Sequence, residues 1–355
     1  MASDKTKDYI AKYSEIQRKT FLQEGYALAL PMCFPGDSVS IDPDESRIND
    51  LILASDNSIY GVTDGEKAHL FGAMTRDVTG FVFDMGLIPG KGTATAVVDG
   101  IKDVFVCRGS AIYRHEKLMP PFDCLQEWFI DRAPFADDCL SVDSGSILHA
   151  VGIEGNVLAG ITASELFIAD MSGKKSRILY TDKLDSGNSG HLLKTEDGIA
   201  GVNKKGVLWT FSIGNKKFEK NDLGLKGEER ACLCVSGGRI LIGAGNRIIS
   251  FDPRNRTSGL LAELPLAPLT TLAAMSDGRI CATSGKEIEH LFEVDVPTAI
   301  MRDLGVFVSV LAARRYGYNF RTSLVGSQGE LILGEYDRGA HLWLYFPKIR
   351  KTEKG

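Results

Sequence analysis

The sequence has no apolar run long enough to cross a bilayer and no apolar leader near its start. Residues 1–8 are mixed in charge, and no later stretch approaches the roughly 18 consecutive apolar residues of a membrane helix. Basic residues are not in excess either, because 41 Lys and Arg stand against 46 Asp and Glu, a formal net charge of -5. These absences predict a cytoplasmic protein that has neither membrane nor nucleic-acid partners.

Cysteine is sparse and carries no recognisable pattern. The seven cysteines are scattered without the Cys-x-x-Cys pairs of zinc sites or the density of a disulfide scaffold. The sequence also lacks G-x-S-x-G, a phosphate-binding glycine loop, H-E-x-x-H and an EF-hand loop. We therefore expect free thiols, no bound metal and no cofactor.

Glycine, in contrast, is abundant, with 38 residues that indicate many tight turns. They belong to a recurring pattern: a strand, a turn rich in Gly, Asn or Asp, a second strand that closes on a small residue, and a third short strand. The pattern is clearest at 52–61 and 272–282. A repeat of this kind indicates the fold more directly than any single motif does.

Counting the small residue that closes each second strand gives seven units, separated by 39 to 53 residues. These residues are Gly61, Cys107, Gly160, Gly201, Gly243, Ala282 and Gly334. Units of this length, built from short strands without a long helical pattern, favour four-stranded propeller blades over a β-sandwich. Over roughly residues 45–347 the chain resembles the seven-bladed β-propeller superfamily of the kelch and WD40 kind. Neither the Trp-Asp signature nor the kelch double glycine recurs, so no functional family is indicated.

The two ends of the chain predict how an all-β, seven-bladed ring would close. The last unit has no fourth strand before Pro347, so we expect residues 26–41 to supply it and remove an open sheet edge. Residues 1–25 have apolar residues at helical spacing, which predicts an amphipathic helix. The expected organisation is that helix, a single propeller domain over 26–347, and a solvated charged tail over 348–355.

Two histidines depart from the repeat. His149 and His191 lie 11 and 10 residues before their closing glycines, near the mouth of the inner strands of adjacent blades. Histidine is well suited to proton transfer near neutral pH, so both are candidate catalytic residues. The alternative interpretation is that these are hydrogen-bonded histidines that line a water-filled channel.

A run of arginine and tyrosine, residues 314–321, leads into the inner strand of the last blade. Guanidinium groups bind carboxylates or phosphates and tyrosine faces stack on sugar rings, so the run suits an acidic carbohydrate. Arg315, Asn319 and Arg321 are therefore candidate ligand-binding residues. Alternatively, the arginines pair with acidic residues of the 335–338 loop and lock the ring.

Three other histidines recur at the start of a third strand, each followed by Leu and then Phe or Trp. They are His69, His290 and His341. Recurrence favours a structural role, in which the imidazole bridges to a neighbouring backbone carbonyl. Acidic loops precede two of them, so His69, His341 and Asp337 also stay in the candidate ligand-binding set.

Two functional hypotheses follow. In the first, the channel mouth binds a small molecule or acidic oligosaccharide, with lyase or hydrolase activity. Several polysaccharide lyases are seven-bladed propellers, and that resemblance implies His149 or His191 as the base, Tyr318 as proton donor and Arg315 or Arg321 as the carboxylate clamp. In the second, the protein is a protein-interaction platform without catalysis, which predicts a broad exposed patch on one face.

Overall fold

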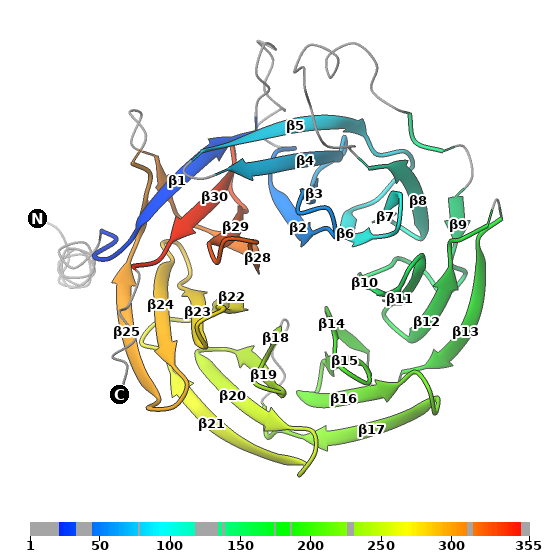
Figure 1. Ribbon diagram of the computed structural model, residues 1–355. Helices are drawn as coiled ribbons and strands as arrows, with labels where there is room; N and C mark the ends of the chain where they lie inside the picture. Colours follow the sequence, from blue (N-terminus) through cyan, green and yellow to red (C-terminus); the bar gives the residue numbers. More distant parts are fainter. Residues whose placement is uncertain are drawn as a thin grey trace, which may run out of the picture.

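The computed structural model describes residues 21–32, 45–76, 79–117, 134–136, 139–173, 175–184, 187–225, 231–310 and 315–348. Seven four-stranded antiparallel sheets are arranged in a ring around a central channel (Figure 1). This arrangement confirms the all-β, seven-bladed propeller expected from the repeat. The described residues include no helix with the length and apolar content that crossing a bilayer requires.

In the first six blades the strands follow the chain from the channel outward. Blades one to three comprise β2 (Ile48–Leu53), β3 (Ile59–Thr63), β4 (His69–Arg76) and β5 (Thr79–Leu87); β6 (Ala94–Asp99), β7 (Asp103–Arg108), β8 (Ala111–Glu116) and β9 (Cys139–Ser141); and β10 (His149–Glu154), β11 (Val157–Ile161), β12 (Glu165–Asp170) and β13 (Arg177–Lys183). Blades four to six comprise β14 (Asn188–Lys194), β15 (Gly198–Asn203), β16 (Val207–Ser212) and β17 (Lys217–Asp222); β18 (Cys232–Ser236), β19 (Arg239–Ala244), β20 (Arg247–Asp252) and β21 (Thr257–Glu263); and β22 (Leu269–Ala274), β23 (Arg279–Ser284), β24 (His290–Asp295) and β25 (Ile300–Gly305).

In four of the seven blades the small residue that closes the second strand is paired with an aromatic residue on the third strand. In blade one Gly61 is paired with Phe71, and a Cβ added to that glycine would lie 2.3 Å from the ring. The same holds in blade three, where the added Cβ of Gly160 would lie 2.2 Å from Phe167. Because real Cβ atoms do not approach so closely, the glycine and the aromatic residue recur together.

The hydrophobic core is divided into clusters between neighbouring blades. Tyr60 and Val62 of blade one, for example, pack in one buried cluster with Val97 and Val104 of blade two. Each blade therefore depends on its neighbours to cover its apolar faces, which is why the seven units form one ring.

Blade seven joins the two ends of the chain. It comprises β28 (Phe320–Val325), β29 (Leu331–Glu335), β30 (His341–Phe346) and, at its outer edge, β1 (Tyr26–Pro31). β1 pairs antiparallel with β30 from Tyr26 opposite Phe346 to Pro31 opposite His341. The predicted N-terminal closing strand is thereby confirmed over 26–31, whereas residues 33–44 lie outside the described residues.

The segment that precedes β1 is attached to blade six. Phe21 forms a parallel bridge with Val306, just before the short hairpin of β26 (Phe307–Val308) and β27 (Tyr316–Gly317). Two N–H···O bonds of 3.0 and 2.9 Å join this segment to residues 304–306, and Arg302 binds Glu24 through two nitrogens at 3.1 and 2.9 Å. Of the helix predicted over 1–25, residues 1–20 lie outside the described residues and 21–25 contain no helix.

Candidate functional site

The central channel contains a cavity of about 980 Å³, and the inner strands of all seven blades line it. Because these strands run in the same direction, their first residues gather at one mouth and their last residues at the other. The first mouth carries polar side chains such as Asp50, His149 and Arg321, whereas the other carries apolar ones such as Leu53 and Leu193. A second cavity, of about 440 Å³, lies at the polar mouth.

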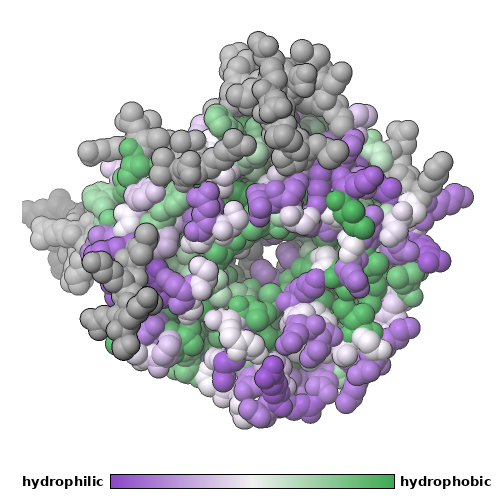
Figure 2. All heavy atoms as spheres, viewed as in Figure 1, coloured by the Kyte–Doolittle hydropathy of each residue, from purple (hydrophilic) through white to green (hydrophobic). Residues whose placement is uncertain are grey.

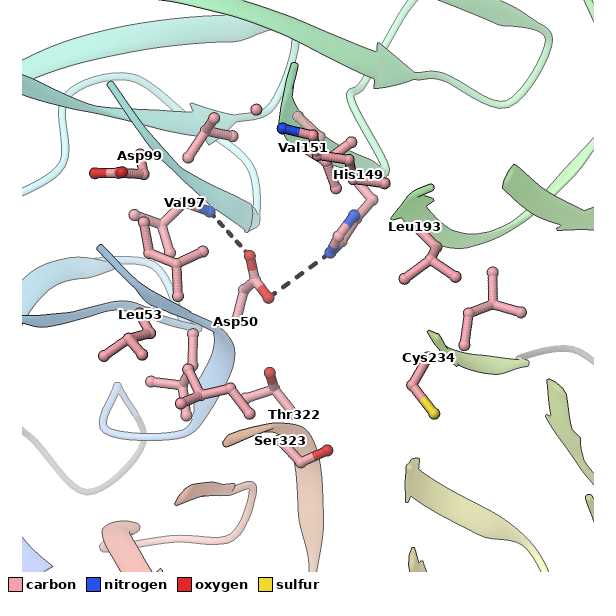
Figure 3. A pocket seen from close by; sticks show the side chains of 18 of the residues that line it. Asp50, Leu53, Val97, Asp99, His149, Val151, Leu193, Cys234, Thr322 and Ser323 are labelled. Carbon is pink, nitrogen blue, oxygen red and sulfur yellow. Dashed lines mark hydrogen bonds and ion pairs between the residues drawn. The ribbon is translucent and has the colours of Figure 1, made fainter. Parts of the chain in front are cut away.

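Two histidines and one aspartate meet at the polar mouth. The rings of His149 and His191 are stacked, with centroids 5.0 Å apart and an interplanar angle of 18°. Nε2 of His149 lies 3.7 Å from Oδ1 of Asp50, whose other oxygen accepts a 3.0 Å hydrogen bond from the Val97 N–H (Figure 3). The Asp50 carboxylate, fixed by the Val97 N–H, thus faces the edge of the His149 ring across 3.7 Å.

The sequence placed the two histidines on adjacent blades but did not identify Asp50 as the partner of His149. A signal was present, because Asp50 lies 11 residues before Gly61, as His149 does before Gly160. His191 lies only 10 residues before its glycine, and the register of β14 is irregular between residues 188 and 192. An irregularity of this kind changes the direction in which side chains point along a strand. Equal spacing from the closing glycine therefore did not reveal that Asp50, His149 and His191 meet.

Arg315 lies in the closure of blade seven. Its Nη2 is 3.3 Å from Glu335 Oε2, 3.1 Å from Asp337 Oδ1 and 3.2 Å from the Gly339 carbonyl. Burial, and next the charge of Glu335, raise the pKa of Asp337 to about 6. This is the geometry expected if the arginines pair with the 335–338 loop. Arg314 lies outside the described residues.

Arg321 alone of the described members of the arginine-tyrosine run lines the channel. Its guanidinium stacks on the Tyr336 ring, 4.5 Å from the centroid. Tyr318 is 37% exposed, stacks on Tyr316 at 6.2 Å, and lines neither channel cavity, while the Asn319 carbonyl accepts the Tyr336 N–H. The structure thus gathers the two channel histidines and Arg321, and places Tyr318, Asn319 and Arg315 elsewhere.

The recurring histidines bind carboxylates and do not line the two channel cavities. Nδ1 of His69 lies 3.0 Å from Asp84, and Nδ1 of His290 lies 3.0 Å from Asp303, each acid being on the fourth strand of the same blade. Nδ1 of His341 lies 3.3 Å from Glu335. The contacts of His69 and His290 connect neighbouring strands, as a structural role requires, although the partner is a carboxylate and not the expected backbone carbonyl.

Neither a metal-ligand cluster nor an activated thiol is found among the side chains discussed below, all in the part of the chain that the structure describes. It contains no group of three or more His, Cys, Asp or Glu side chains placed to hold a metal ion. Burial raises the pKa of the Cys234 and Cys281 thiols to about 12, and also raises that of Cys107. These buried thiols stay protonated at neutral pH and are poor nucleophiles.

The ring and its closure define the chain as a seven-bladed β-propeller. The fold resembles the WD40 β-propeller domain of Doa1, with a TM-score of 0.60 and 11% identity, over 92% of this chain and 98% of that one. It also resembles the WD40 repeats of RRP9 (0.61, 11%, 92% and 99%) and a chain of the Mitotic Checkpoint Complex (0.62, 10%, 93% and 94%). No protein-family model matches the sequence, and no curated protein sequence matches it.

Proposed function

We propose that this propeller is a protein-interaction platform, and that its docking surface is the apolar mouth of the channel. The observation that carries the proposal is an apolar rim, which we define as Leu53, Ile101, Ile153, Leu193 and Val235. All five line the large cavity, and Ile101 and Val235 are 67% and 40% exposed. On the face in view, apolar residues (green in Figure 2) border much of the central opening, interrupted by polar ones.

The rim is assembled from five different blades, at the ends of their inner strands or in the turns that follow. Ile101 and Val235 belong to no described core cluster, whereas Leu53, Ile153 and Leu193 are partly buried against such clusters and leave the rest of their side chains at the opening. Exposed apolar groups gathered around a concave opening are typical of a binding surface. The opening can receive one apolar side chain of a partner, with the rim packed around it.

Charge around the rim selects the kind of partner. Among the turns that surround it, exposed carboxylates outnumber exposed cations. Glu154, Glu196 and Asp197 are exposed there, against Lys102 and Lys194. Complementary charge steers association and disfavours like-charged partners. The partner that fits is a protein segment with an apolar anchor residue flanked by Lys or Arg.

The structural comparisons support a docking role in general terms. Two of the similar structures are WD40 propellers, and the third is part of a multiprotein assembly, the Mitotic Checkpoint Complex. A propeller offers a rigid disc on which loops from every blade present one continuous surface. The likeness at 10–11% identity concerns the fold, so the proposed docking surface depends on this chain's own residues.

A peptide array tests the proposal directly. The probes are peptides with a central Leu, Phe or Trp flanked by Lys and Arg, and matched peptides flanked by Asp and Glu. We expect the full-length protein to bind the basic set, and Ile101→Ala together with Val235→Ala to weaken binding at least about tenfold. Leu260→Ala is the matched control, because Leu260 is 59% exposed but lies on β21 at the outside of the ring. Equal binding of the acidic set, or equal loss in the control, contradicts the proposal.

A further inference from the structure

The opposite mouth of the channel has a different chemistry. The 440 Å³ cavity there, which we call the polar chamber, is lined by residues of blades one to four and of blade seven. Its charged, imidazole and amide side chains are those of Asn49, Asp50, His149, Asn188, His191, Lys204 and Arg321. A volume of this size suits a small ligand and is too small for a folded partner.

Positive charge prevails in the polar chamber. Lys204 is exposed and forms no ion pair within the described chain, and Arg321, near the start of β28, lines the same cavity. Asp50 is the one carboxylate among the described lining residues, and it already holds the Val97 N–H and faces His149. The described lining therefore holds two permanent cations and one carboxylate, and this balance of charge favours an anion.

The guanidinium of Arg321 is held in place before any ligand arrives. It lies over the Tyr336 ring at 4.5 Å, and Arg47 lies over the same ring at 5.5 Å. The Tyr336 hydroxyl donates a 2.6 Å hydrogen bond to Asp64, which fixes the ring. A cation positioned by its neighbours loses little conformational entropy on binding a carboxylate or phosphate.

The chamber also contains two amide oxygens that lack a hydrogen-bond donor among the described residues. Asn49 and Asn188 line it and are 6% and 2% exposed. Each donates its amide nitrogen at 2.8 Å, to the carbonyls of residues 94 and 162, yet neither amide oxygen has a hydrogen-bond partner among the described residues. A buried acceptor left unpaired costs roughly 1–3 kcal/mol, so hydroxyl donors in the chamber would be stabilising.

We propose that the polar chamber binds a small anion that also carries hydroxyl groups. Lys204 and Arg321 bind the anionic group, and the amide oxygens of Asn49 and Asn188, after small side-chain rotations, accept from the hydroxyls. The anionic group is a carboxylate or a phosphate, since a guanidinium and an ammonium serve both. The proposal is independent of the docking surface, because it uses the other mouth of the channel and different side chains.

Isothermal titration calorimetry on the full-length protein distinguishes the possibilities. Glucuronate and glucose 6-phosphate are the two anionic probes, glucose lacks the charge, and acetate and inorganic phosphate lack the sugar hydroxyls. We expect one or both sugar anions to bind, and Lys204→Gln and Arg321→Gln each to weaken that binding at least about tenfold. Lys205→Gln is the matched control, because Lys205 is exposed in the same turn but does not line the chamber.

The outcomes separate cleanly. A tenfold loss in Lys204→Gln with less than a twofold change in Lys205→Gln supports the site, and the tighter probe identifies the anionic group. Absence of binding by either sugar anion at millimolar concentration overturns the proposal. Glucose binding as tightly as the sugar anions overturns the anion assignment, and acetate or phosphate binding as tightly overturns the hydroxyl assignment. If Arg321→Gln lowers the melting temperature, the exposed Lys204→Gln variant still decides.

Discussion

Replacing Asp337 by asparagine tests whether the closure of blade seven holds a carboxyl group in an unfavourable environment. The side chain is 21% exposed, 3.1 Å from Arg315, and next to the fully buried Glu335. Burial and the Glu335 charge raise its pKa to about 6, against an ordinary value of 3.8. The folded protein therefore retains a proton on Asp337 over a pH range in which the unfolded chain has lost it.

The sign and size of the effect follow from this difference. Stability from the protonated carboxyl is fully present below pH 3.8, is lost as pH rises toward 6, and is constant above that. Between pH 5 and pH 7.5 the wild-type protein should lose on the order of 1 kcal/mol of its free energy of unfolding through this group. Asparagine has no proton to lose, so the Asp337→Asn variant should not show that loss.

Urea denaturation at pH 5 and pH 7.5 measures the prediction. The quantity to compare is the free energy of unfolding of Asp337→Asn minus that of the wild type. This difference should be more positive by about 1 kcal/mol at pH 7.5 than at pH 5, whatever its value at pH 5. Asp197→Asn, at an exposed turn position remote from the blade-seven closure, is the matched control variant. If this difference is the same at both pH values, or is smaller at pH 7.5 than at pH 5, the blade-seven closure does not raise the pKa of Asp337, and the reasoning is refuted.

Three further predictions concern the fold. Leu28→Ala in β1 should lower the free energy of unfolding by about 2–5 kcal/mol in urea denaturation, because Leu28 is buried in the blade-seven core, and a loss below about 1 kcal/mol contradicts this. Gly160→Ala should destabilise by roughly 1–3 kcal/mol through its clash with Phe167, whereas Gly214→Ala, with open space around the added Cβ, should be nearly neutral in thermal melts. Deleting residues 1–31 should abolish soluble folding, and an unchanged melting temperature contradicts the closure.

The blade architecture was predictable because it is a local property repeated along the chain. A small residue on the second strand and an aromatic residue on the third are paired within one blade, as Gly61 and Phe71 are. Their spacing in the sequence therefore reports their contact in space. The closing strand was predictable for a different reason, since an unpaired outer edge of β30 had to be covered by some other segment, and residues 26–31 cover it.

The candidate site was only partly predictable. His149 and His191 were identified because they depart from the repeat, and their rings are stacked at the polar mouth. Asp50 was missed, and Arg315, expected to bind ligand or to lock the ring, is 3.3 Å from Glu335 in the closure. The direction of each side chain depends on strand register and on loop conformation, neither of which residue spacing defines.

The sequence by itself determined the number of blades, the position of the turns and the need for an N-terminal closing strand. The blades and turns depend on contacts within one repeat, and the closing strand is required because the last repeat lacks its fourth strand. Only the tertiary structure decided that the channel has an apolar and a polar mouth, and that Asp50, His149, His191 and Arg321 meet at the latter. Those residues come from four blades, so their proximity arises from closing the ring, which brings residues 50 and 321 together from opposite ends of the propeller sequence.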